Sequence, residues 1–135
     1  MPALTFPASF DYLDEIREYV GEKARAAGFS DRDVYSIQLA ADEAASNVIE
    51  HAYAGNSKAT FELSCEFDTN RLVITLLDHG KRFDPSKVPQ PDVEADLSER
   101  KIGGLGIFLM RKLMDEVRYE STRDGNRLTL VKRKV

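Results

Sequence analysis

Residues 39–53 read LAADEAASNVIEHAY, and small or apolar residues recur there at spacings of three and four. The same periodicity upstream predicts one amphipathic helix with a buried stripe of Val34, Ile37, Ala41, Ala44, Ala45, Val48 and Ala52. Glu43 and Asn47 are four residues apart, so they lie one turn apart on one face, beside that stripe. A carboxylate and an amide among small neighbours leave room for a ligand, although the spacing alone favours a solvated Glu and a surface Asn.

Capping signals set the bounds of this helix and of the one before it. Ser30-x-x-Asp33 resembles a capping box, so the helix is predicted to begin after Ser30 and to end near His51 or Ala52, before Gly55-Asn56. Upstream, residues 4–6 predict a short strand. Residues 10–27 predict a further helix, with Ser9 as its N-cap and Gly28 as its terminator.

Downstream of residue 57 the pattern changes to short β-rich runs. Residues 58–67 and 71–77 predict a hairpin that turns at 68–70, and residues 117–122 and 127–135 predict another that turns at 124–126. Between them, a helix is predicted from Gly103 to near Asp115. This order predicts an α+β two-layer sandwich, with helices on one face of a mixed, largely antiparallel sheet. The basic end, residues 132–134, is interpreted as protection of an edge strand.

Length and composition indicate one domain over residues 1–135. The chain has 19 Lys+Arg against 23 Asp+Glu, a formal net charge of −4, which argues against nonspecific binding to nucleic acid or to anionic membranes. Its one cysteine, Cys65, excludes an intrachain disulfide and fits a reducing cytoplasm. No stretch has the ~18 apolar residues that a membrane span needs. A cytoplasmic protein is expected.

Asp78-His79-Gly80 directly follows the apolar run 72–77, which places a carboxylate at the end of a buried strand. Asp78 could accept a hydrogen bond from a ligand's amino group there, and Gly80 would let a flat ring approach the backbone closely. An ordinary Asp-x-Gly turn is the alternative, and it is the commoner case. His79 is expected to face solvent.

Gly103-Gly104-Leu105-Gly106 opens the third predicted helix. Unpaired N–H groups and the helix dipole favour an anion such as a phosphate at this position. The motif is not a phosphate-binding loop of the G-x-x-x-x-G-K-[ST] type, and a hinge is the alternative. The preceding residues 84–100 contain three prolines and no sustained periodicity, which is typical of a lid or a binding loop.

Together and in this order, these three motifs resemble the N box and the two glycine boxes of the Bergerat-fold ATPases. Within that superfamily, the sequence most resembles the bacterial anti-sigma-factor serine/threonine kinases. The stretches that carry the resemblance are residues 39–53, 78–85 and 103–117. Arg82 replaces a second glycine of the first glycine box, but the ending Phe83-Asp84-Pro85 is common in the anti-sigma subgroup.

The resemblance implies a role for each motif residue. Glu43 would be the general base, and Asn47 would bind Mg²⁺ as part of the ATP site. Asp78 would accept from the adenine amino group, and Gly80 would admit the ring. Gly104, Leu105 and Gly106 would present backbone N–H groups to the phosphates, and residues from about 84 to 102 would form a lid. The family's small or hydroxyl residue near the last strands is matched only loosely, by Gly125 and Thr129, and Thr129 is taken as part of the implied cofactor site.

The implied activity is transfer of the γ-phosphoryl group of Mg·ATP to a serine or threonine of an anti-anti-sigma protein of the sulfate-transporter-and-antagonist type. That protein and a sigma factor would compete for this chain, which would be a homodimer like its relatives. Two alternatives remain: a nucleotide-dependent switch module without phosphotransfer, and an ATPase that passes phosphate to water.

Overall fold

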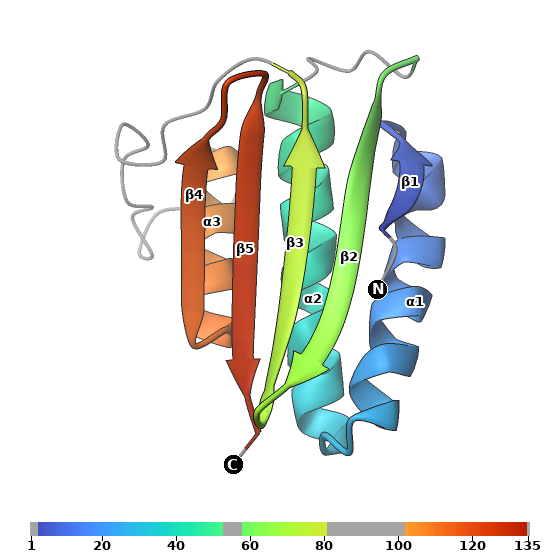
Figure 1. Ribbon diagram of the computed structural model, residues 1–135, viewed down its shortest axis with the longest axis vertical. Helices are drawn as coiled ribbons and strands as arrows, with labels where there is room; N and C mark the ends of the chain where they lie inside the picture. The colour runs from blue at the N-terminus through green and yellow to red at the C-terminus, as the bar shows by residue number, and fades with distance from the viewer. Residues whose placement is uncertain (1–2, 53–57, 81–101, 135) are drawn as a thin grey trace.

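The computed structural model describes residues 3–52, 58–80 and 102–134. They form two layers, a five-stranded sheet and a layer of helices that covers one face of it (Figure 1). The two-layer α+β fold expected from the sequence is confirmed. The predicted break at Gly55-Asn56 lies outside the described residues. So does the predicted lid, 84–102, apart from Ile102, which begins a helix.

The first two helices begin where side-chain oxygens can cap them. Ser9 Oγ accepts from the backbone N–H of Asp11 (3.2 Å) at a 3-10 turn, η1 (Phe10–Tyr12), that leads into α1 (Leu13–Ala26). Ser30 Oγ accepts from the N–H of Asp33 (3.2 Å) at the start of α2 (Asp31–Asn47). α2 then continues into a π-helical turn, η2 (Val48–Ala52), so the helical segment ends where the sequence predicts.

The remaining elements are the strands and the third helix: β1 (Leu4–Pro7), β2 (Thr60–Asp68), β3 (Arg71–Asp78), α3 (Ile102–Leu113), β4 (Glu116–Ser121) and β5 (Asn126–Arg133). The strand order is β1-β2-β3-β5-β4. Every described neighbouring pair is antiparallel, so the sheet that the sequence predicted as mixed shows only antiparallel pairs. Thr69 and Asn70, both at positive φ, form the two-residue turn between β2 and β3.

The hydrophobic core lies between the two layers. Alternate residues of β2 and β3 face the helices and are buried, as the period of two in a strand requires. In β5 the four consecutive residues 128–131 are all buried. The strand side of the core is Phe61, Leu63, Cys65, Leu72, Ile74, Leu76, Leu128 and Leu130. The helix side includes Ile16, Val20, Ile37, Ala41, Ala44, Ile107 and Met110. The predicted stripe is therefore buried from Val34 to Val48, while the side chain of Ala52 lies outside the described part of the structure.

The basic end of β5 has a different role from the one predicted. β5 lies between β3 and β4, so it is not an edge strand. Lys132 Nζ donates to the carbonyl of Leu113 (2.8 Å), and Lys134 Nζ donates to that of Ala27 (3.1 Å). Lys132 of β5 and Lys134, which follows it, thus satisfy carbonyls at the C-terminal ends of α3 and α1, where positive charge is favourable.

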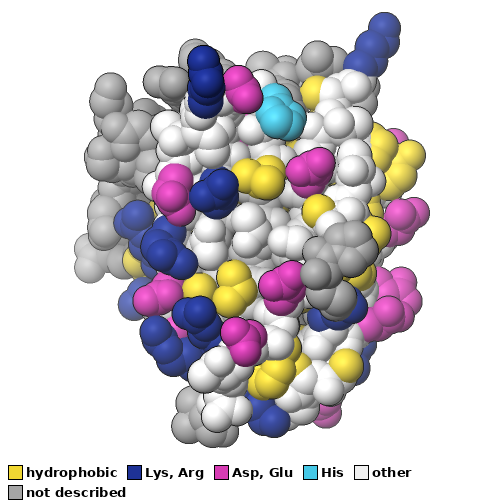
Figure 2. Space-filling view, viewed as in Figure 1, with side chains coloured by type: hydrophobic (Ala, Val, Ile, Leu, Met, Phe, Trp, Pro, Cys, Tyr) yellow, Lys and Arg dark blue, Asp and Glu magenta, His cyan; other side chains and the backbone are white. Residues whose placement is uncertain are grey.

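The face of the sheet away from the helices carries charges of both signs, as Figure 2 shows. Arg133 and Glu116 form a cross-strand ion pair (3.4 Å), and Arg127 lies 3.9 Å from Glu120. These exposed pairs contribute little to stability individually. None of the helices in the described part of the chain is long and apolar enough to span a membrane.

Candidate functional site

Glu43 and Asn47 project from the same side of α2, as their spacing predicts. Asn47 is 6% exposed, whereas Glu43 is half-buried. Asn47 is also the last residue of the α-helix before the π-helical turn η2 begins. π-helical turns occur frequently at functional sites. The sequence predicted the helix face but not this change of helix type beside Asn47.

The pKa of Glu43 is raised above the usual value of 4.5. Burial is the largest cause, because it disfavours the charged carboxylate, and the neighbouring carboxylates of Asp42 and Glu50 add to it. A carboxylate with a raised pKa accepts a proton more readily than a solvated one. Glu43 therefore has the chemistry of a general base.

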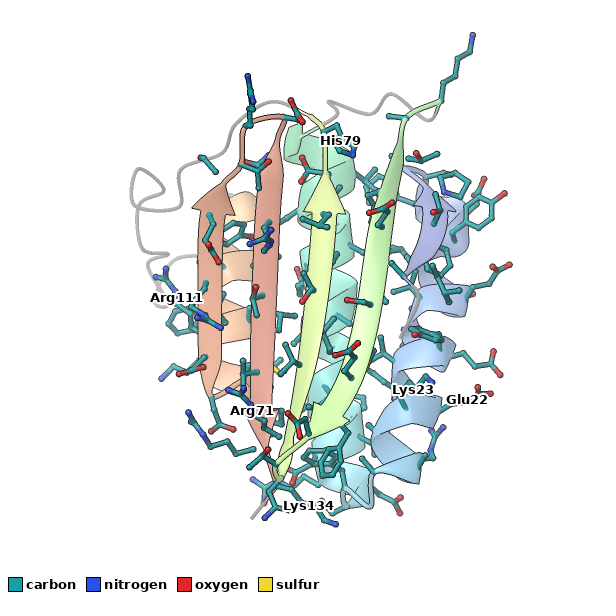
Figure 3. All side chains as sticks on the ribbon, viewed as in Figure 1. Glu22, Lys23, Arg71, His79, Arg111 and Lys134 are labelled. Atoms are coloured by element: carbon teal, nitrogen blue, oxygen red, sulfur yellow. The ribbon has the colours of Figure 1, made fainter. Side chains whose placement is uncertain are left out.

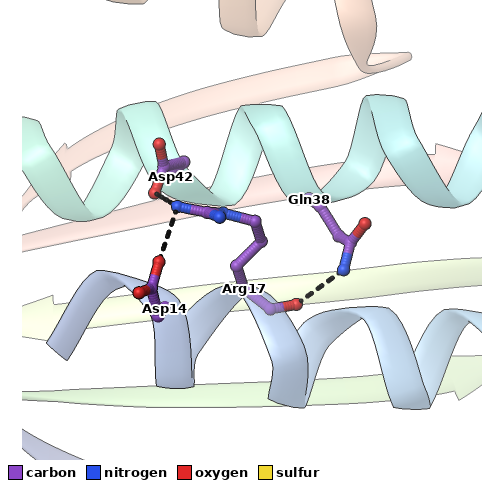
Figure 4. Close-up of polar contacts among 4 residues, drawn as sticks. All are labelled: Asp14, Arg17, Gln38 and Asp42. Atoms are coloured by element: carbon purple, nitrogen blue, oxygen red, sulfur yellow. Dashed lines mark hydrogen bonds and ion pairs between the residues drawn. The ribbon is translucent and has the colours of Figure 1, made fainter.

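Arg17 of α1 contacts Asp42, the residue that precedes Glu43 on α2. Its Nη2 atom lies 3.2 Å from Asp14 Oδ1 and 3.5 Å from Asp42 Oδ1 (Figure 4). Asp42 Oδ1 is buried without a hydrogen bond to any described residue, so its contact with Arg17 is Coulombic. Gln38 Nε2 donates to the carbonyl of Arg17 (3.0 Å), which ties the same stretch of α1 to α2. Both contacts help to fix the position of α2 next to the site.

Tyr119 reaches the site from β4. It pairs with Leu128 in the sheet, so it lies on the helix-facing side, and its hydroxyl accepts from Asn47 Nδ2 (3.3 Å). Burial raises the pKa of Tyr119 to about 12; the bond to Asn47 and the charge of Arg111 oppose the shift, and Asp78 adds to it. The hydroxyl is therefore protonated at neutral pH.

Asp78 ends β3 on the same inner side and is 5% exposed. Its Oδ1 atom accepts two hydrogen bonds, one from Asn126 Nδ2 (2.9 Å) and one from the backbone N–H of Gly80 (3.0 Å). Among the described residues, the donors to Asp78 both reach Oδ1, which leaves Oδ2 as the oxygen that could accept from a ligand. A buried carboxylate oriented in this way can select a ligand that presents an amino group.

The N-terminal end of α3 points toward this end of the sheet. The C-terminal end of α3 meets β5 at Lys132, whereas Asp78 pairs with Asn126 at the opposite end of β5. Figure 1 shows α3 running in that direction behind β4 and β5, and Figure 3 places His79 and Lys134 at opposite ends of the molecule. The backbone of Gly104, Leu105 and Gly106 belongs to the first turns of α3, as predicted.

Thr129 is the predicted site residue that the structure does not bring to this cluster. It pairs with Thr75 on the sheet face away from the helices, so its side chain is separated from Asp78 by the sheet itself. Asn126, which the sequence analysis missed, occupies the position opposite Asp78 instead. Its place directly after Gly125 in the predicted turn was the available signal. His79 is exposed, as expected.

Gly125 allows the β4–β5 turn to approach the backbone of Asp78 and His79 closely. A Cβ atom there would overlap with the carbonyl group of Asp78 and lie 2.7 Å from His79 Cα. Because the obstacle is backbone, relief of the overlap requires the turn to move away from Asp78 and to carry Asn126 with it.

We therefore expect Gly125→Ala to lower the free energy of unfolding by about 1–3 kcal/mol and to weaken nucleotide binding as well. Denaturant titration and calorimetric titration with ATP measure the two effects. Ser121→Ala, at an exposed position of the same hairpin, is the matched control. Wild-type stability together with wild-type affinity in Gly125→Ala would contradict the close approach described here.

Comparison with known proteins identifies the family. A family model described as a histidine kinase-like ATPase domain matches residues 6–132. The chain belongs to this family. Within it, the chain is 32% identical to the serine-protein kinase RsbW of Halalkalibacterium halodurans over 118 residues, which cover 84% of this chain and 72% of the relative. It is 34% identical to the RsbW of Staphylococcus epidermidis over 120 residues, covering 84% and 75%. The chain is thus a member of the RsbW family of anti-sigma serine-protein kinases.

Two solved structures show the same fold. The structure of the RsbU and RsbW domains of Rv1364c from Mycobacterium tuberculosis superposes with a TM-score of 0.64 at 20% identity, covering 98% of this chain and 32% of that one. The catalytic domain of the histidine kinase ThkA superposes with a TM-score of 0.58 at 13% identity, covering 99% and 97%. At these identities the likeness concerns the fold alone.

Proposed function

We propose that this chain is an ATP-dependent serine/threonine protein kinase that phosphorylates an anti-anti-sigma protein and sequesters a sigma factor. The observation that carries the proposal is the pair on α2: a half-buried glutamate with a raised pKa, one turn from a buried asparagine. The family membership and the relatives named serine-protein kinase support it. The protein would act in the cytoplasm as a homodimer.

The chain's residues have separate tasks in this reaction. Asp78, held by Asn126 and Gly80, would bind the adenine amino group and so favour ATP over GTP. The N–H groups of Gly104, Leu105 and Gly106 would bind phosphate oxygens at the start of α3. Glu43 would take the proton from the substrate hydroxyl while the hydroxyl oxygen forms a bond to the γ-phosphorus. The bond from that phosphorus to the bridging oxygen breaks, and ADP leaves.

The side-chain carbonyl oxygen of Asn47 is chemically suited to bind Mg²⁺. Mg²⁺ prefers oxygen ligands and takes only one or two of them from protein, so a single buried amide beside a nucleotide site is enough. Bound Mg²⁺ would neutralise charge on the phosphates. The described residues hold no group of three or more His, Cys, Asp or Glu side chains that could bind a metal ion.

Phosphoryl transfer to candidate partners tests the proposal. With Mg²⁺ and γ-labelled ATP, the chain should label a serine or threonine of one anti-anti-sigma protein of its host. Asn47→Ala should abolish the labelling, whereas Ser36→Ala, earlier on the same helix face, should not. ATP binding without labelled protein or free phosphate would favour the switch module instead. Release of free phosphate alone would favour an ATPase.

A further inference from the structure

Tyr119 takes no direct part in the proposed phosphoryl transfer, but its hydroxyl contacts Asn47. It comes from β4, one of the two edge strands of the described sheet, and reaches the end of α2, where its hydroxyl oxygen accepts from the Asn47 amide at 3.3 Å. Tyr119 is only partly exposed, and Asn47 is almost fully buried. The bond links two elements that are 72 residues apart in the sequence.

We propose that Tyr119 is a positioning residue that pairs the amino group of Asn47 while the carbonyl oxygen of the same amide binds the cation. The inference rests on the proposed function, because it assumes that Mg²⁺ enters with the nucleotide. It adds a residue that acts on Asn47 and not on the nucleotide itself.

The two ends of an amide side chain have opposite chemistry. A cation binds only the carbonyl oxygen, which leaves the two N–H groups to be paired. In a buried position, an unpaired N–H group costs about as much as a lost hydrogen bond. The Tyr119 hydroxyl oxygen provides an acceptor in the orientation observed here, with Nδ2 toward β4.

The benefit of this contact depends on the cation. When the cation is absent and the Tyr119 hydroxyl has been removed, the Asn47 amide can turn to another partner or to water. With its carbonyl oxygen held by the cation, the amide cannot turn, and the N–H group stays unpaired. Removal of the hydroxyl should therefore weaken the nucleotide complex that contains Mg²⁺ and spare the complex without it.

Tyr119→Phe in the full chain tests this, because it removes the hydroxyl and keeps the ring. The dissociation constant of ATP is measured in EDTA and in excess Mg²⁺. The constant in EDTA divided by the constant in Mg²⁺ then gives the gain in affinity that Mg²⁺ provides. We expect Tyr119→Phe to reduce that ratio about three- to tenfold and to leave the constant in EDTA unchanged. Tyr19→Phe, the same change on α1, should leave the ratio unchanged.

Asn47 supplies a second readout that does not depend on affinity. In the Mg·ADP complex of the wild type, hydrogen exchange of its side-chain NH₂ group should be slow, and in Tyr119→Phe it should be faster. An unchanged ratio, an equal loss in EDTA and in Mg²⁺, or unchanged exchange would each overturn the inference. A wild-type protein that binds ATP equally well in EDTA and in Mg²⁺ would overturn instead the metal-binding part of the proposed function.

Discussion

Glu43→Gln should abolish phosphoryl transfer while ATP still binds. The amide keeps the size of the side chain but cannot accept the substrate's proton, and loss of a general base typically slows a reaction by about 10²–10⁴-fold. Transfer is measured with γ-labelled ATP and a substrate protein, and binding by calorimetry. A variant that retains more than a tenth of the wild-type rate would show that Glu43 is not the base.

Glu50→Gln is the matched control for this change. Glu50 lies in η2, carries the same charge and is one of the groups that raise the pKa of Glu43. The control makes the same chemical substitution near the site without removing the proposed base. Its transfer rate at neutral pH should stay within a few-fold of that of the wild type.

The same Glu43→Gln protein should be more stable than the wild type at pH 7. Because the pKa of Glu43 is raised by folding, the native state binds the proton more tightly than the unfolded chain does. The wild type therefore loses stability as the pH rises from below 4.5 through the native pKa of Glu43, and the variant does not. Denaturant titrations at pH 7 and below pH 4.5 measure the free energy of unfolding of both proteins. The difference between the variant and the wild type should be smaller at the acidic pH. A less stable variant at pH 7 would contradict the burial cost assigned to Glu43.

Asp78→Asn should remove most of the affinity for adenine nucleotides. Asn126 and Gly80 both donate to Oδ1, so the amide should keep its oxygen on that side and turn its NH₂ group toward the ligand. Two amino groups then face each other, and loss of a hydrogen bond to a charged group weakens binding about ten- to a hundredfold. Calorimetric titration with ATP, ADP and GTP measures the effect and the loss of selectivity.

Asp68→Asn makes the same change at the other end of the β2–β3 hairpin. Asp68 is exposed, and Thr69 Oγ1 donates to its Oδ1 (3.0 Å). Nucleotide affinity should be unaffected in this control. If Asp78→Asn binds ATP within twofold of the wild type, Asp78 is a structural strand end and the adenine site lies elsewhere.

Local patterns in the sequence predicted the parts of the site that depend on local geometry. Glu43 and Asn47 share a face because helix periodicity puts them there, and Asp78 lies inside because it continues the alternation of a buried strand. The choice between Thr129 and Asn126 depends on register. An odd shift along a strand moves a side chain to the other face of the sheet, and only the pairing with β3 fixes which residue meets Asp78.

Long-range arrangement accounts for what the sequence did not predict. Tyr119 meets Asn47 only because the tertiary fold brings its side chain from β4 to the end of α2, and no short-range pattern links the two. The last strand is interior because β4, which precedes it, takes the edge of the sheet. Lys132 and Lys134 can reach helix ends only in that order of strands.

The pairing of β3 with β5 also bears on how this family can vary. It joins Asp78 to Asn126 across 48 positions, and the sequence between β3 and α3 belongs to the closed loop. The entropy cost of closing a loop grows only with the logarithm of its length, so doubling the length costs about 0.6 kcal/mol. Insertions between β3 and α3 should therefore be nearly neutral for stability, so the length of this stretch of sequence can change without rebuilding the sheet that holds Asp78.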